Sequence, residues 1–200
     1  MSNKPVIYVV EDDSEMCESI EMLISSEGYE VYTYHRAEDF LENFDSSIAG
    51  CLVLDIRMPG MNGLELQERL NEMGSDVPIV FITGHGDIPI AVRAMKGGAA
   101  SFIEKPFDAD VLLGNISQAL KKAEEQRGSR MSRQAIEEKK SRLTRREKQI
   151  LEMLREGRSN KSIAFELGVS QKTVSFHRVN ILEKMGAKSL VDLTRMMMDR

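Results

Sequence analysis

CLVLD, residues 51–55, runs four apolar residues directly into an aspartate. A short apolar run of this kind, preceded by Gly50, indicates a strand that is buried on both faces, as the strands of a parallel sheet are. Asp55 then stands at the point where this strand leaves the core. Because ligands of parallel α/β sheets bind at the carboxyl ends of the strands, Asp55 is the first candidate functional residue.

The first part of the chain repeats this pattern of a short apolar run followed by a helical one. Apolar residues at helical spacing separate the runs, so strands and helices alternate strictly. Parallel strands need such crossover helices, and the alternation therefore predicts a doubly wound α/β fold: a five-stranded parallel sheet with helices on both faces. The predicted strands are Val6–Val10, Glu30–Tyr34, Gly50–Leu54, Pro78–Ile82 and Ser101–Ile103.

Charge is divided unevenly between the two parts of the chain. Residues 1–125 hold 23 acidic and 9 basic side chains, a net charge of −14, whereas residues 126–200 hold 9 acidic and 18 basic side chains, a net charge of +9. Such an asymmetry suggests that the basic part binds a polyanion and that the acidic part has another task.

The pattern predicts an α/β domain over residues 1–122 and a charged helical linker over residues 123–141, with one weak break at Gly128-Ser129. Residues 142–200 are wholly helical in pattern. They predict a small all-α domain of four short amphipathic helices, separated by Gly157, Gly168 and Gly186.

Composition narrows the class of protein. Hydrophobic residues make up 42% and charged residues 30% of the 200 residues, which is typical of a globular protein. We expect no membrane span, since no apolar run approaches the roughly 20 residues needed, and no signal peptide, since the first apolar run meets acids at once. Cys17 and Cys51 are too few for a disulfide framework, so we expect a cytoplasmic protein with reduced thiols.

Chemically notable groups follow several of the predicted strands. Glu11-Asp12-Asp13 follows the first strand and Asp55 the third, while Thr83 and Lys105 follow the fourth and fifth. Carboxylates that converge at one sheet edge repel one another unless a hard cation joins them, and Mg²⁺ suits such a site. These groups fit phosphoryl transfer, with Asp55 as the nucleophile that forms an acyl phosphate, Lys105 pairing with a phosphate oxygen and Thr83 hydrogen-bonding another.

Residues 160–184 contain two amphipathic helices that meet at Gly168-Val169-Ser170. A turn of three or four residues with a glycine is typical of a helix-turn-helix, and Ser170 can cap the second helix. The outward positions of that helix combine cations with small and apolar residues, which suits a DNA major groove. They are Gln171, Lys172, Ser175, Phe176, Arg178 and Val179.

The α/β part resembles the receiver domain of two-component response regulators. The matching segments are Glu11-Asp12, residues 54–63 (LDIRMPGMNG), Thr83-Gly84 and Lys105-Pro106-Phe107. The resemblance implies that a sensor histidine kinase phosphorylates Asp55. It further implies a Mg²⁺ site, a switch and a cis peptide bond at Lys105–Pro106. The Mg²⁺ ligands would be Asp12, Asp55 and the Arg57 backbone carbonyl, with Glu11 acting through water, and the switch residues would be Thr83 and Phe102. Glu11 departs from the family, where Asp is commoner.

The basic part resembles the LuxR-type DNA-binding domain at residues 143–147 (LTRRE), 157–161 (GRSNK) and 173–177 (TVSFH). Its pairing with a receiver is typical of the FixJ/NarL family, and the segments 83–87 (TGHGD) and 182–190 (LEKMGAKSL) place the chain nearer the FixJ side. The resemblance implies promoter DNA and RNA polymerase as partners and a homodimer when phosphorylated. The resemblance also implies roles for single residues. Ser175, Phe176 and Val179 would read bases, and Lys161, Lys172, Thr173 and His177 would lie near phosphates. The helix that forms the dimer on DNA would carry Leu190, Leu193 and Met197.

Two other functions are worth testing against the same residues. A metal-dependent phosphatase or mutase with Asp55 as nucleophile would need a second acid as general acid or base and a substrate cap, and residues 55–66 offer neither. A constitutive DNA-binding protein with a degenerate receiver would lack Asp55, Thr83 or Lys105, and all three are present. We therefore expect a phosphorylation-switched transcription factor and not an enzyme.

Overall fold

The computed structural model describes residues 5–45, 48–84 and 88–198, so residues 85–87 of the segment 83–87 lie outside the described part. The chain divides into two compact units, an N-terminal unit of Met1–Glu125 and a C-terminal unit of Gln126–Arg200. Among the helices of the described ranges, none combines the length and the apolar character that a membrane span requires.

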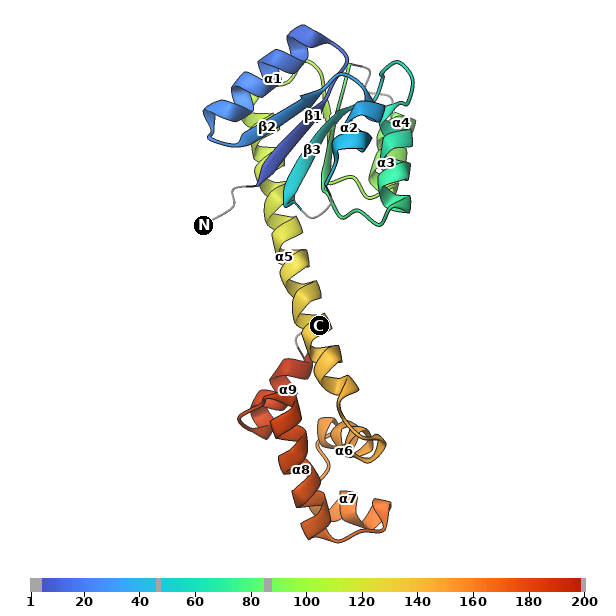
Figure 1. The fold of residues 1–200 in the computed structure, drawn as a ribbon, viewed down its shortest axis with the longest axis vertical. Helices are drawn as coiled ribbons and strands as arrows, with labels where there is room; N and C mark the ends of the chain where they lie inside the picture. Colours follow the sequence, from blue (N-terminus) through green and yellow to red (C-terminus); the bar gives the residue numbers. More distant parts are fainter. Residues whose placement is uncertain (1–4, 46–47, 85–87, 199–200) are drawn as a thin grey trace. The chain divides into compact units, whose positions relative to one another are not determined.

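The N-terminal unit is built on a five-stranded parallel sheet in the order β2-β1-β3-β4-β5 (Figure 1). The predicted doubly wound fold is thus confirmed. The strand order reverses between β1 and β3, which makes the carboxyl ends of these two strands the expected place for a ligand. The strands are β1 (Val6–Val10), β2 (Glu30–Tyr34), β3 (Gly50–Asp55), β4 (Ile79–Thr83) and β5 (Ser101–Glu104).

Helices cover both faces of the sheet. On one face α1 (Ser14–Ser26) and α5 (Ala109–Ser141) pack against the odd-numbered residues of β1 and β3, with Ile20, Ile24 and Ile116 at the centre of the core. On the other face lie α2 (Ala37–Asn43), α3 (Gly63–Glu72) and α4 (Ile88–Lys96), whose core centres on Phe40 and Leu66. The strands β1, β3 and β4 are buried throughout, which explains their continuous apolar sequence.

α5 continues without interruption from Ala109 to Ser141, through the segment predicted as a separate linker. Gly128 does not break it, although glycine costs about 1 kcal/mol relative to alanine inside a helix, because the residues around it are mostly good helix formers. The sequence places a domain boundary after residue 122 and the compact units divide after Glu125. Both points lie inside this helix, where no change of secondary structure marks a border.

Four helices follow α5 in the C-terminal unit: α6 (Arg145–Arg155), α7 (Asn160–Leu167), α8 (Gln171–Met185) and α9 (Leu190–Met198). Their core centres on Ile150, Ile163, Val174 and Ile181, each fully buried. α7 ends at Gly168, which adopts a left-handed conformation with φ 64°, and Ser170 caps α8 by accepting a hydrogen bond from the backbone N–H of Thr173. α7 and α8 therefore form the predicted helix-turn-helix.

Candidate functional sites

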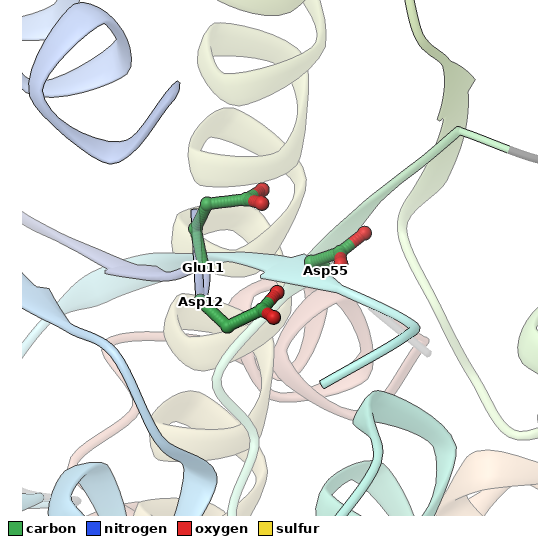
Figure 2. Close-up of side chains that lie close together, drawn as sticks. All are labelled: Glu11, Asp12 and Asp55. Carbon is green, nitrogen blue, oxygen red and sulfur yellow. The ribbon is translucent and has the colours of Figure 1, made fainter. Parts of the chain in front are cut away.

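Three carboxylates meet at the carboxyl ends of β1 and β3. One oxygen from each of Glu11, Asp12 and Asp55 lies within 4.8 Å of the other two, and Figure 2 shows the three side chains gathered beyond the strand ends. Glu11 and Asp55 are buried, at 1% and 5% exposure, whereas Asp12 is exposed. This is the arrangement that the switch point of the sheet predicts.

Lys105 supplies the positive charge at this site. Its Nζ lies 2.6 Å from Glu11 Oε2 and 3.4 Å from Asp55 Oδ1. Burial raises the pKa of the Asp55 carboxyl above its usual value, and the Lys105 ammonium opposes that effect. Burial likewise raises the pKa of Glu11, against the hydrogen bond from Lys105. Three carboxyl groups thus share one lysine at this site, and their oxygen atoms suit a hard divalent cation.

The loop after Asp55 is fixed by glycine and by a helix cap. Gly63 N donates to Ile56 O at 3.0 Å, and a Cβ on Gly63 would lie 2.2 Å from the backbone oxygen of Asp55, so only glycine fits there. Asn62 caps α3 and forms a reciprocal capping box with Glu65. The MNG part of the segment 54–63 therefore holds Asp55 against the start of α3.

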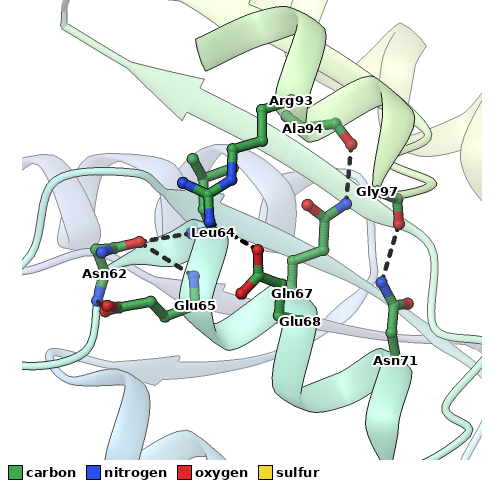
Figure 3. Close-up of polar contacts among 9 residues, drawn as sticks. All are labelled: Asn62, Leu64, Glu65, Gln67, Glu68, Asn71, Arg93, Ala94 and Gly97. Carbon is green, nitrogen blue, oxygen red and sulfur yellow. Dashed lines mark hydrogen bonds and ion pairs between the residues drawn. The ribbon is translucent and has the colours of Figure 1, made fainter.

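Polar contacts tie α4 to α3 (Figure 3). Gln67 Nε2 donates to Ala94 O and Asn71 Nδ2 to Gly97 O, each at 3.0 Å. Arg93 pairs with Glu68 at 2.7 Å. Beside these contacts lies a shallow pocket of about 630 Å³, which Asp12 of the acidic cluster lines. Its lining residues are Asp12, Ile56, Arg57, Met58, Pro59, Asn62, Leu64, Ile90 and Arg93.

The other residues predicted for this site lie on β4 and β5 and in the loop after β3. Thr83 ends β4, is 1% exposed, and its backbone oxygen accepts a hydrogen bond from Lys105 N at 2.7 Å. Phe102 on β5 is half-buried and packs against the core beneath α3 and α4. The Lys105–Pro106 bond is cis, as the resemblance implied. Arg57 is exposed next to the pocket, and the role of its backbone carbonyl stays a prediction.

The predicted DNA-binding residues lie on α7 and α8. Lys161, Lys172 and Ser175 are exposed, as are Phe176 and Val179 with exposures of 64% and 61%. Thr173 and His177 are half-buried on the flank of α8, and Nδ1 of His177 has no hydrogen-bond partner among the described residues. The base-reading and phosphate-contacting roles of these residues stay predictions.

Asn160, at the start of α7, bridges to two residues of α8 and was not singled out from the sequence. Its Nδ2 donates to Ser175 Oγ at 3.1 Å, and its Oδ1 accepts from Arg178 Nη1 at 2.6 Å. A polar residue just after a capping serine reads as part of a helix start, so nothing in the local pattern reveals a contact with a residue 18 positions away.

The predicted dimer residues pack within their own unit. Leu193 is 2% exposed, and Leu190 and Met197 are half-buried against the same core. The role of these three residues in a dimer stays a prediction. On the same helix Val191 is 79% exposed.

Comparison with known proteins finds a matching family for each of the two units. The family described as "Response regulator receiver domain" matches residues 7–117, and the family described as "Bacterial regulatory proteins, luxR family" matches residues 141–197. The first match covers most of the N-terminal unit with its acidic site, and the second covers the helix-turn-helix. Together they define a class: response regulators that join a receiver to a LuxR-type DNA-binding domain.

Full-length relatives narrow the class. The chain is 44% identical over 190 residues to the response regulator protein TodT of Pseudomonas putida strain F1, a match covering 95% of this chain and 84% of TodT. It is 42% identical over 198 residues to the transcriptional regulatory protein FixJ of Bradyrhizobium diazoefficiens, covering 99% of this chain and 97% of FixJ.

Solved structures lead to the same conclusion. The response regulator StyR superposes with a TM-score of 0.85 at 46% identity, covering 98% of this chain and all of StyR. Full-length FixJ from B. japonicum gives a TM-score of 0.62 at 41% identity, covering 99% of this chain and 98% of FixJ. The chain belongs to the FixJ/NarL-type family of response regulators, and it is a two-component transcription regulator. Such proteins are typically not enzymes.

Proposed function

We propose that Asp55 accepts a phosphoryl group from the phosphohistidine of a sensor kinase and that this modification controls DNA binding by the C-terminal unit. A carboxylate oxygen of Asp55 forms the new O–P bond while the N–P bond of the phosphohistidine breaks and its imidazole leaves. The observation that carries the proposal is the position of Asp55, buried at the end of β3 with two further carboxylates and Lys105 around it.

The donor set fits a magnesium ion, held by Asp12, Asp55 and the Arg57 backbone carbonyl, with Glu11 acting through water. Carboxylate and carbonyl oxygens are what this cation prefers. When bound it would neutralise charge on the phosphoryl group and the acids. Lys105 already faces Asp55 and would pair with one phosphoryl oxygen, and the Thr83 hydroxyl would hydrogen-bond another.

The switch follows from Thr83 and Phe102. Movement of Thr83 toward the phosphoryl group frees space that Phe102 fills, which changes the outer surface near α4 and α5 or the adjoining α1. A two-state element that one added charge biases is the form such a switch needs. We propose that the changed surface favours a homodimer, with α9 and its Leu190, Leu193 and Met197 contributing in the DNA-bound state.

The C-terminal unit would bind the DNA. We propose that α8 enters the major groove of promoter DNA, with Ser175, Phe176 and Val179 at base edges and Lys161, Lys172, Thr173 and His177 near phosphates. The dimer would occupy two half-sites about one helical turn apart and would act on transcription with RNA polymerase. We place the protein in the cytoplasm, together with the promoter DNA that it would bind, and we expect it to transmit a signal and not to act as an enzyme.

Phosphorylation of the protein by a small-molecule phosphodonor tests whether Asp55 is the phosphoryl acceptor. In Mg²⁺ the parent should form an acid-stable, base-labile adduct, and Asp55→Asn should form none because the amide is a poor nucleophile. Asp39→Asn, a change of the same type at an exposed position of α2, is the control and should label like the parent. Full labelling of Asp55→Asn would show that the acceptor is another residue.

Sedimentation of the labelled and unlabelled parent tests the switch. We expect a monomer at micromolar concentration without the phosphodonor and a dimer with it, whereas Asp55→Asn should stay monomeric in both conditions. An unchanged monomer in both states of the parent would contradict phosphorylation-driven dimerisation without affecting the assignment of Asp55.

A further inference from the structure

The outward face of α8 is unusually apolar for a helix surface. Val174, Ile181 and Met185 are fully buried, and a rotation of 100° per residue places Lys172, Phe176 and Val179 on the opposite side of the helix, with Ser175 on the flank beside them. Phe176 and Val179 lie one turn apart there, with 64% and 61% of their surfaces exposed. Contiguous exposed apolar side chains that polar residues surround mark an interaction surface.

The occupant of this face is DNA, an inference that rests on the function proposed above. The C-terminal unit carries a net charge of +9, and Lys172 lies one turn before Phe176 on the same face. Phe176 and Val179 have no hydrogen-bonding group, so they cannot read base edges by the donor and acceptor pattern that most recognition helices use.

Arg178 is not part of this exposed surface. Arginine is the commonest side chain to read guanine, but Arg178 is half-buried on the flank of α8, where its Nη1 donates to Asn160 Oδ1 at 2.6 Å. Asn160 also donates to Ser175 Oγ, and the Ser175 hydroxyl can itself donate to a base acceptor. α8 thus exposes the hydroxyl of Ser175 and the apolar side chains of Phe176 and Val179.

The thymine C5-methyl is the apolar group that the major groove offers. We propose that Phe176 and Val179 read thymine methyl groups, so that the half-site of this protein contains thymines recognised through their methyls, with Ser175 as the polar contact beside them. Replacing thymine by deoxyuridine removes the methyl and leaves the hydrogen-bonding pattern of the base pair intact.

The test starts from duplexes selected by the full-length protein with Mg²⁺ and acetyl phosphate. Each thymine of the selected half-site is replaced singly by deoxyuridine, and affinity is measured at one fixed salt concentration. At one or two thymines the affinity should fall roughly fourfold, the value for about one buried methylene-sized group. Phe176→Ala should abolish the loss at one of these thymines, and Val179→Ala should reduce it at another.

Two variants serve as controls. Phe165→Ala removes a phenylalanine that is 91% exposed on α7, off the reading face, and should keep the methyl dependence of the parent. Lys172→Ala should weaken binding to all these duplexes alike and keep the same dependence, because a lysine–phosphate contact carries no base information.

Three results would count against the inference. A selected site in which no thymine methyl affects affinity overturns it, as does a methyl dependence that persists unchanged in both Phe176→Ala and Val179→Ala. Either result leaves sequence-specific DNA binding intact. If the parent selects no sequence at all, the proposed DNA recognition itself is wrong, and this inference is wrong with it.

Discussion

Lys105 Nζ lies 2.6 Å from Glu11 Oε2, in a contact between residues 94 positions apart in the sequence. Both side chains are largely buried, and Asp55 Oδ1 is 3.4 Å from the same ammonium group. In this family the first acid is commonly Asp, and here the longer side chain of Glu11 reaches Lys105 directly. Lys105 therefore stabilises two buried carboxylates.

Lys105→Met should lower the free energy of unfolding of the N-terminal unit by about 3 kcal/mol in EDTA, because it leaves two buried acids without their cation. Urea unfolding followed by tyrosine fluorescence measures this, since all four tyrosines lie in this unit. Lys96→Met, at an exposed position of α4, is the control and should change stability by less than about 0.5 kcal/mol. Equal stability of the two variants would show that the Lys105 contacts contribute nothing.

Magnesium should raise the unfolding temperature of the N-terminal unit, because a ligand that binds only the folded state stabilises it by mass action. Asp12→Ala removes an exposed carboxylate of the cluster and should abolish the increase, whereas Asp39→Asn should retain it. Thermal unfolding by tyrosine fluorescence in Mg²⁺ and in EDTA provides the comparison. An unchanged increase in Asp12→Ala would rule out Asp12 as a ligand.

The strands could be predicted from sequence because β1, β3 and β4 are buried on both faces and so read as unbroken apolar runs. The predicted bounds of β1 and β2 are those observed, and the bounds of β3, β4 and β5 differ by at most one residue at an end. The sequence predicts that residues 123–141 are helical, but it does not reveal that they continue the helix that begins at Ala109, since Gly128 is as typical of a break between two helices as of one helix.

The acidic site was accessible to prediction for a topological reason: the carboxyl ends of parallel strands meet at one edge, so Glu11, Asp12 and Asp55 had to converge. The direct contact between Glu11 and Lys105 and the bridge from Asn160 to Ser175 and Arg178 depend on side-chain conformations. No local pattern contains that information. The burial of Leu193 is a similar case, because an amphipathic helix has the same sequence pattern whether its apolar face packs on its own core or on a partner.

Gly63→Ala should destabilise the N-terminal unit by about 1–3 kcal/mol and slow phosphorylation of Asp55, because the new Cβ would lie 2.2 Å from the Asp55 backbone oxygen and must displace that strand end. Gly114→Ala is the matched control, since Gly114 lies in α5 with open space around it. It should be neutral or stabilising by about 0.5–1 kcal/mol. Urea unfolding and the initial rate of labelling check both effects, and a normal labelling rate in Gly63→Ala would contradict the coupling.

The C-terminal unit should lose stability in acid through Glu147. This carboxyl is 3% exposed; burial alone would raise its pKa, but the hydrogen bonds from Lys184 at 2.7 Å and from Thr144 outweigh that effect and hold the pKa below its usual value of 4.5. A lowered pKa in the folded state means that the stabilisation is complete above the unfolded value and is lost as the pH falls through 4.5 and below.

Glu147→Gln tests this, because glutamine can keep the capping box of α6 while it removes the charge that pairs with Lys184. We expect the variant to be about 1.5 kcal/mol less stable at pH 7, the contribution of a hydrogen bond to a charged group, and to lose less stability than the parent between pH 6 and pH 4. The C-terminal unit has no tyrosine, so its transition is the part of the 222 nm circular dichroism change that tyrosine fluorescence does not follow. Glu152→Gln, whose exposed pair with Arg155 contributes little, should behave like the parent. If Glu147→Gln showed the full acid sensitivity of the parent, another carboxylate would have to hold α6 against α8.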